Sequence, residues 1–144
     1  METATMGRVL TEATIENLKD VWAAEEKRLP PEKVRRIVVK DALVDTGVTM
    51  LSLPTRLIRK LGLILLDRRP VTNRGGSGEA AIYEAVRLTI QGRFFSTDVI
   101  EAPDETPVMI GHLALTALDF VVDRQSGSLI GNPAHGGEQI LELY

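Results

Sequence analysis

The segment that most constrains this chain is residues 42–47, a short apolar run that ends in an acidic residue and a glycine turn. Such a run is typical of the end of a buried strand, and Gly47 allows the positive φ that a sharp chain reversal needs. Asp45 is therefore expected at a strand end, held by packed neighbours, with the Thr46 hydroxyl beside it. A bare Asp-Thr-Gly sequence more often forms an ordinary turn, in which the carboxylate accepts hydrogen bonds only from nearby backbone N–H groups.

Hydrophobic periodicity predicts a mostly β protein. Residues 8–16 alternate between apolar and polar side chains, as expected for a strand with one buried face. Residues 34–44 form the strand that carries the acid, and its middle, 37–39, is β-branched. Further strands are expected at residues 48–53, 63–66, 83–90, 94–100, 108–110, 119–123 and 128–130.

Short helices are predicted between these strands. Asn17 is placed to cap a helix that the prolines at 30–31 would end. Trp22 shares the apolar face of this helix and is expected to pack there or at an interface. We interpret residues 18–33 as a helical or loop insertion between two strands. The other expected helices are residues 54–61 and 113–118.

Composition is that of one globular domain over residues 1–144. A chain of this length buries about two thirds of its unfolded surface, and 44% hydrophobic with 26% charged residues is ordinary. The absence of cysteine excludes disulfides and thiolate chemistry and suits a reducing cytoplasm. The first six residues lack the features of a signal peptide, and no apolar run is long enough for a bilayer. We expect a cytoplasmic protein without a membrane partner.

Several other chemistries lack their sequence signatures. His112 and His135 do not have the spacing of a zinc site, so no metal or other cofactor is expected. The glycine run at 75–78 has no Gly-Lys-Ser/Thr after it, so it does not resemble a phosphate loop, and alone it indicates an ordinary flexible hairpin tip. The basic stretch has no interleaved aromatic residues, so a solvated face is expected and not a nucleic-acid partner. Its members are Arg56, Arg59, Lys60, Arg68, Arg69 and Arg74.

Three separated motifs resemble the retropepsin-like aspartic proteases (clan AA, retroviral type). They are the apolar-Asp-Thr-Gly run at 43–47, the glycine-bearing hairpin at 73–78, and an apolar-apolar-Gly sequence at 108–113. Their order matches the family over residues 36–131. The chain resembles most closely the small bacterial members, which share the runs 118–123 and 131–137.

This resemblance implies a mostly β, single-lobed barrel with one or two short helices that assembles as a homodimer, with residues 131–144 as a C-terminal tail. It further implies an endopeptidase that acts on a peptide or protein substrate beneath a moving flap. Asp45 would be catalytic, and Thr46 and Gly47 would support the active-site loop. The implied substrate contacts are Val48, Gly76, Ser77, Gly78 and Ile110.

Hydrolysis of this kind needs two carboxylates that share one proton, one as general base toward water and one as general acid toward the peptide carbonyl. This chain carries one Asp-Thr-Gly sequence and is too short for a second lobe. A symmetric homodimer would supply a second Asp45. Thr46 would then bond across the two-fold axis, and Gly47 would allow the backbones to approach.

Two departures from the family pattern keep alternatives open. Val48 stands where Ala or Ser is usual, and His112 stands where retroviral enzymes have Arg, whose fixed fork a histidine does not reproduce. Both favour a non-proteolytic dimeric module that binds peptides or acts as a scaffold. A phosphate- or nucleotide-handling domain could also use Asp45 in a metal-phosphate turn, although the chain lacks the second acidic motif that such a site needs.

Overall fold

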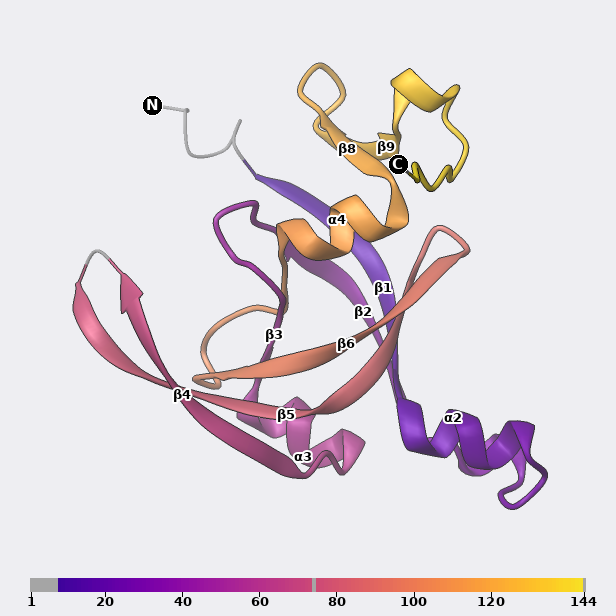
Figure 1. The fold of residues 1–144 in the computed structure, drawn as a ribbon, viewed down its shortest axis with the longest axis vertical. Coiled ribbons are helices and arrows are strands. Elements are labelled where there is room, and N and C mark those ends of the chain that lie inside the picture. Colours follow the sequence, from indigo (N-terminus) through magenta and orange to yellow (C-terminus); the bar gives the residue numbers. More distant parts are fainter. Residues whose placement is uncertain (1–7, 74, 144) are drawn as a thin grey trace.

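The main sheet of the computed structural model, which describes residues 8–73 and 75–143, closes on itself to form a barrel (Figure 1). Its strands follow one another in the order β1 (Val9–Asn17), β2 (Arg36–Val44), β7 (Met109–Ile110), β3 (Leu51–Pro54), β6 (Arg93–Ala102) and β5 (Gly76–Ile90). β1 also pairs with β5, and this pairing completes the ring. The prediction of a mostly β chain is confirmed.

The long strand β5 belongs to two parts of the molecule. Its second half pairs with both β1 and β6, whereas its first half pairs with β4 (Leu65–Asn73), which lies outside the ring. Together β4 and the start of β5 form an arm that projects from the barrel (Figure 1). The alternation of buried Ile82, Val86, Leu88 and Ile90 along β5 shows the strand period that the sequence predicted.

The arm is longer than the sequence indicated. Strands were expected only at 63–66 and from 83 onward, but Gly76 and Gly78 belong to β5 and pair with β4. Arg74 lies outside the described residues, as do residues 1–7 and 144. The free edge of β4 offers few backbone N–H groups to which another strand could bind. Pro70 has no N–H, and the Arg68 N–H already donates to the Asp67 carboxylate, 2.8 Å away.

The insertion at 18–33 contains the helix α2 (Leu18–Glu25) and a short 3-10 turn, η1 (Pro31–Lys33). Asn17 caps α2 as predicted, accepting from the Asp20 N–H, and its amide also donates to Leu61 O at 2.8 Å. Asp20 in turn binds the Arg35 side chain at 2.7 Å. Trp22 does not pack on the buried face of α2 within the chain: it is 52% exposed, because Leu18 and Val21 form that face. Packing of Trp22 at an interface stays a prediction.

Two further helices cover the barrel. α3 (Thr55–Leu61) ends at Gly62, whose φ of 67° is the left-handed value expected of a glycine terminator. α4 (His112–Leu118) follows β7 directly. None of the helices in the described part of the chain is long and apolar enough to cross a membrane.

Large aliphatic side chains fill the barrel, including Leu51, Leu53 and Ile110, each 0% exposed. After α4, the hairpin of β8 (Phe120–Asp123) and β9 (Ser128–Gly131) stands beside the barrel (Figure 1). A short turn, η2 (Pro133–His135), begins the tail that packs back toward the end of α4.

Candidate active site

Asp45 comes directly after β2, and its backbone is fixed from both sides. The parallel pairing of β2 with β7 places Val44 opposite Ile110, and the Asp45 N–H donates to Ile110 O at 3.0 Å. On the other side, the Val48 N–H donates to Asp45 O at 3.1 Å. The Gly47 N–H donates to Asp45 Oδ1 at 2.9 Å, which fixes the half-buried carboxylate within its own turn.

The start of α4 holds the loop that follows the acid. The N–H groups of Gly111, His112 and Leu113 donate to the carbonyls of Met50, Val48 and Thr49 at 2.9, 2.9 and 3.1 Å. These donors have no partner inside the helix, because the first N–H groups of a helix lack a preceding turn. The loop and the helix start therefore satisfy each other's backbone groups.

Position 111 requires a glycine, because the backbone of residues 48–50 passes very close to it. A Cβ atom built on it would lie 2.3 Å from Val48 O and 2.4 Å from Met50 O, distances that side-chain carbons do not tolerate. Next to it, His112 Nδ1 lies 3.2 Å from Val48 O. The His112 ring thus contacts the loop that carries Asp45.

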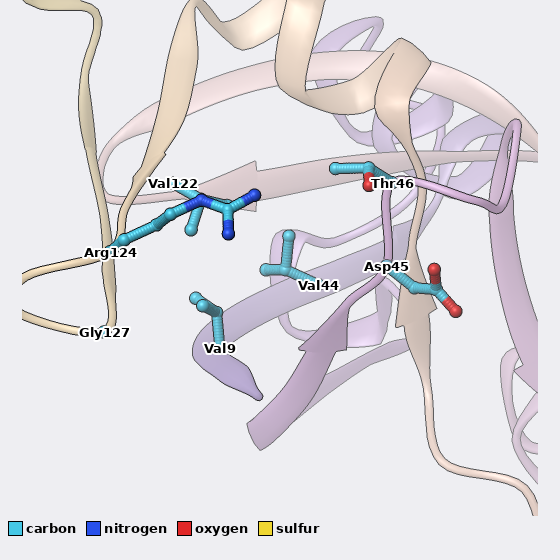
Figure 2. Close-up of a pocket in the computed structure, with 7 residues that line it drawn as sticks. All are labelled: Val9, Val44, Asp45, Thr46, Val122, Arg124 and Gly127. Atoms are coloured by element: carbon cyan, nitrogen blue, oxygen red, sulfur yellow. The ribbon is translucent and has the colours of Figure 1, made fainter. Parts of the chain in front are cut away.

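A cavity of about 330 Å³ lies beside the loop (Figure 2). Its lining residues are Val9, Val44, Asp45, Thr46, Val122, Arg124 and Gly127. The Arg124 guanidinium extends toward Val44 and Thr46, while the Asp45 carboxylate points away from the other labelled side chains (Figure 2). Among the described residues that line the cavity, Asp45 is the one carboxylate and Arg124 the one cation.

The predicted site residues fall into two groups. Asp45, Thr46, Gly47 and Val48 share one loop, and Ile110 lies directly behind it with a side chain fully enclosed in the core. Gly76, Ser77 and Gly78 are exposed on the projecting arm, and they do not line the cavity beside Asp45. A single chain therefore assembles the acid loop but does not bring the glycine-bearing arm to this cavity.

Two features of the site go beyond the sequence predictions. Gly111 belongs to the apolar-apolar-Gly motif at 108–113, but its close approach to the loop after Asp45 was not predicted, although a glycine between an apolar strand and a helix can signal such an approach. Arg124 lies in a polar turn of the β8–β9 hairpin, and nothing in its local sequence marks it. Its position depends on how that hairpin folds back beside β1 and β2.

The local chemistry is that of one half-buried carboxylate, fixed by its own turn and pointing away from the other residues that line the cavity. A lone carboxylate can act as base or as acid, but two are needed to do both in one step. Within the described residues, no group of three or more histidine, aspartate or glutamate side chains is arranged to hold a metal ion.

Comparison with known proteins gives matches among solved structures alone. No protein-family model matches the chain, and no curated protein matches it. Among solved structures, the chain is similar to the protease of EIAV complexed with the inhibitor HBY-793, at 20% sequence identity and a TM-score of 0.46. The match covers 75% of this chain and 85% of that protease.

Proposed function

We propose that this chain is one subunit of a homodimeric aspartic endopeptidase, in which Asp45 from each copy forms the catalytic pair. The observation that carries the proposal is the placement of Asp45. Its backbone is fixed by Ile110 and Val48, and its carboxylate points away from the other residues that line the adjacent cavity. A group held so firmly and facing outward is suited to meet a second copy of itself.

One carboxylate lines the cavity, whereas the proposed reaction needs two, and this supports a dimer. The described residues around the cavity include no other acid, and two carboxylates in proximity would share one proton, because like charges at short range do not both ionise. A two-fold axis beside the loop would bring the Asp45 carboxylates of the two copies together. Thr46, exposed next to the acid, would bond across the axis, and Gly47 leaves room for the approach.

Catalysis would then proceed by proton transfers. The ionised Asp45 takes a proton from water as the water oxygen attacks the peptide carbonyl, and the protonated Asp45 of the partner gives its proton to the carbonyl oxygen. Collapse of the resulting tetrahedral species returns one proton to the pair and delivers the other to the leaving amine. The pair works only when it is singly protonated.

The substrate in this proposal is an extended peptide or protein segment. Val48 would border the pocket beside the acid, and the arm that carries Gly76, Ser77 and Gly78 would close over the substrate as a flap. Ile110 is enclosed in the core, so its substrate contact stays a prediction, while its carbonyl already supports Asp45. The cysteine-free composition suits a cytoplasmic location, which is part of the proposal.

Cleavage of a mixed peptide library by wild type and by Asp45→Asn tests this function. The variant keeps the shape of the side chain but removes the base, so we expect cleavage to be lost while the fold and the dimer remain. Asp41→Asn, which changes an exposed carboxylate on β2, is the matched control and should cleave normally. Undiminished cleavage by Asp45→Asn would end the proposal. Peptide binding without cleavage by wild type would instead identify a binding module.

A further inference from the structure

A second cavity, of about 230 Å³, lies where the start of α2 meets strands β4, β5 and β6. The half-exposed Trp22 side chain forms part of its wall, and we call it the Trp22 cavity. None of the described residues that line it also lines the cavity beside Asp45. The inference drawn from the Trp22 cavity therefore does not depend on the proposed function.

Two β-bulges in neighbouring strands open the sheet at this cavity. Where β4 pairs with β5, Leu66 is an extra residue on β4. Where β5 pairs with β6, Glu84 and Ala85 together face the single residue Asp98. All four of these residues line the cavity. Bulges redirect side chains and are common next to active sites, so the backbone of the sheet itself creates this hollow.

The wall formed by α2 is held in place at its first turn. α2 continues directly from β1 (Figure 1). At the junction the buried Asn17 side chain accepts from the Asp20 N–H at 3.2 Å and donates to Leu61 O at 2.8 Å. The Asp20 carboxylate in turn accepts from Arg35 Nε and Nη2 at 2.7 and 3.0 Å. Trp22, further along the same helix, is thus placed beside the bulges before any ligand binds, which lowers the ordering cost of binding.

The charges on the wall do not cancel. The Lys19 ammonium lies 3.1 and 3.2 Å from the two carboxylate oxygens of Glu84, which also accepts from the Ile64 N–H at 3.0 Å. These two side chains neutralise each other. The half-buried Asp98 side chain makes no hydrogen bond or ion pair with the described residues. The lining residues of the Trp22 cavity therefore leave one negative charge without a partner.

An apolar hollow beside a free carboxylate selects a basic side chain. A purely apolar group would remove Asp98 from water without giving it a partner, and an acidic group would be repelled. A basic side chain can lay its methylene stem on Leu18 and Leu66 and direct its cation to Asp98. Arginine suits the site better than lysine, because its planar guanidinium stacks on an indole ring and forms two parallel hydrogen bonds with one carboxylate.

We propose that the Trp22 cavity binds an arginine side chain presented by another polypeptide, with the guanidinium between Trp22 and Asp98. Apolar residues flanking that arginine would contact Ile64 and Leu66, which are 56% and 57% exposed. The partner is therefore a segment in which one arginine stands among apolar residues.

Tryptophan fluorescence of the full chain tests the proposal, because Trp22 is the one tryptophan in the sequence. The probe is a terminally blocked pentapeptide with a central arginine between alanines. Matched peptides carry citrulline, which has the shape of arginine without its charge, or glutamate in the central position. We expect a saturable change in Trp22 emission with the arginine peptide, binding weaker by about tenfold or more with citrulline, and none with glutamate. Added salt should weaken the binding of the arginine peptide.

Two variants that keep Trp22 locate the effect. Asp98→Asn removes the free charge and breaks no contact within the described chain, so it should fold normally and bind the arginine and citrulline peptides equally. Asp41→Asn, which changes an exposed carboxylate on β2, should keep the wild-type preference.

Four results would overturn the proposal. They are no saturable response to the arginine peptide at millimolar concentrations, equal binding of arginine and citrulline by wild type, an undiminished preference in Asp98→Asn, and loss of the preference in Asp41→Asn. A fifth concerns a different occupant: if Trp22 emission changed with protein concentration alone, and Asp98→Asn abolished that change, a second copy of the chain would fill the cavity.

Discussion

The amide nitrogen of Asp45 lies 3.0 Å from the carbonyl oxygen of Ile110, so the candidate catalytic residue is fixed by a strand from the far half of the chain. The same strand leads into α4, whose first N–H groups hold the carbonyls of the loop that follows Asp45. The acid loop is thus enclosed between β7 and α4. The geometry of this loop depends more on backbone hydrogen bonds than on side-chain contacts.

Gly111→Ala should disrupt the acid loop. The added methyl would lie 2.3 Å from Val48 O and 2.4 Å from Met50 O, so either the loop or α4 must move. We expect a loss of stability of about 1–3 kcal/mol from overpacking and loss of peptide cleavage. Urea unfolding measures the first effect. Gly78→Ala is the control for stability, because a Cβ there meets nothing within 4 Å; equal stability of the two variants would contradict the packing described for Gly111.

Stability should depend on Asp20 at acidic pH. The hydrogen bond from Arg35 is the main cause that lowers the pKa of Asp20 below 3.8, so the unfolded chain binds the proton more tightly than the folded one. The contribution of Asp20 is then fully present above pH 3.8 and is lost as pH falls through the lower folded-state pKa. Urea unfolding between pH 2.5 and 6 should show a weaker pH dependence for Asp20→Asn than for wild type. Asp41→Asn, exposed on β2, should follow the wild-type curve; identical curves for all three proteins would refute the role of the Asp20 pair.

Arg93→Lys should destabilise the junction between the barrel, α4 and the tail. The guanidinium donates to three backbone carbonyls and lies 4.6 Å from the centroid of the Phe120 ring, a combination that a single ammonium group does not reproduce. We expect a loss of about 1–3 kcal/mol, the usual cost when a buried acceptor such as Leu118 O loses its donor. Arg124→Lys changes an exposed arginine and should lose much less stability. Thermal unfolding of both variants measures the difference.

Much of the barrel could be predicted from sequence because it follows from local rules. The cap at Asn17, the terminator at Gly62 and the period-2 alternation along β5 each depend on residues close in sequence. The position of Asp45 at a strand end was predicted for the same reason, since the apolar run before it and the glycine after it fix that geometry.

Features that depend on contacts between distant segments could not be predicted. Trp22 has the spacing of a buried residue, but its exposure depends on how α2 lies against the barrel. The arm of β4 and β5 extends through Gly76 and Gly78 because a neighbouring strand offers pairing that outweighs the low strand preference of glycine. The contact between Asp119 and His135 joins residues on either side of a hairpin, and neither residue alone indicates it.

The central claim, that the active unit needs Asp45 from two chains, is tested most directly by mixing subunits. Wild-type and Asp45→Asn chains are combined in equal amounts at constant total concentration, allowed to exchange, and assayed for peptide cleavage. Random pairing leaves about a quarter of the dimers with two intact acids, so the account predicts about a quarter of the wild-type activity. Mixing with Asp41→Asn should leave activity unchanged. Retention of half the activity would mean that each chain carries a complete site, and it would contradict the account.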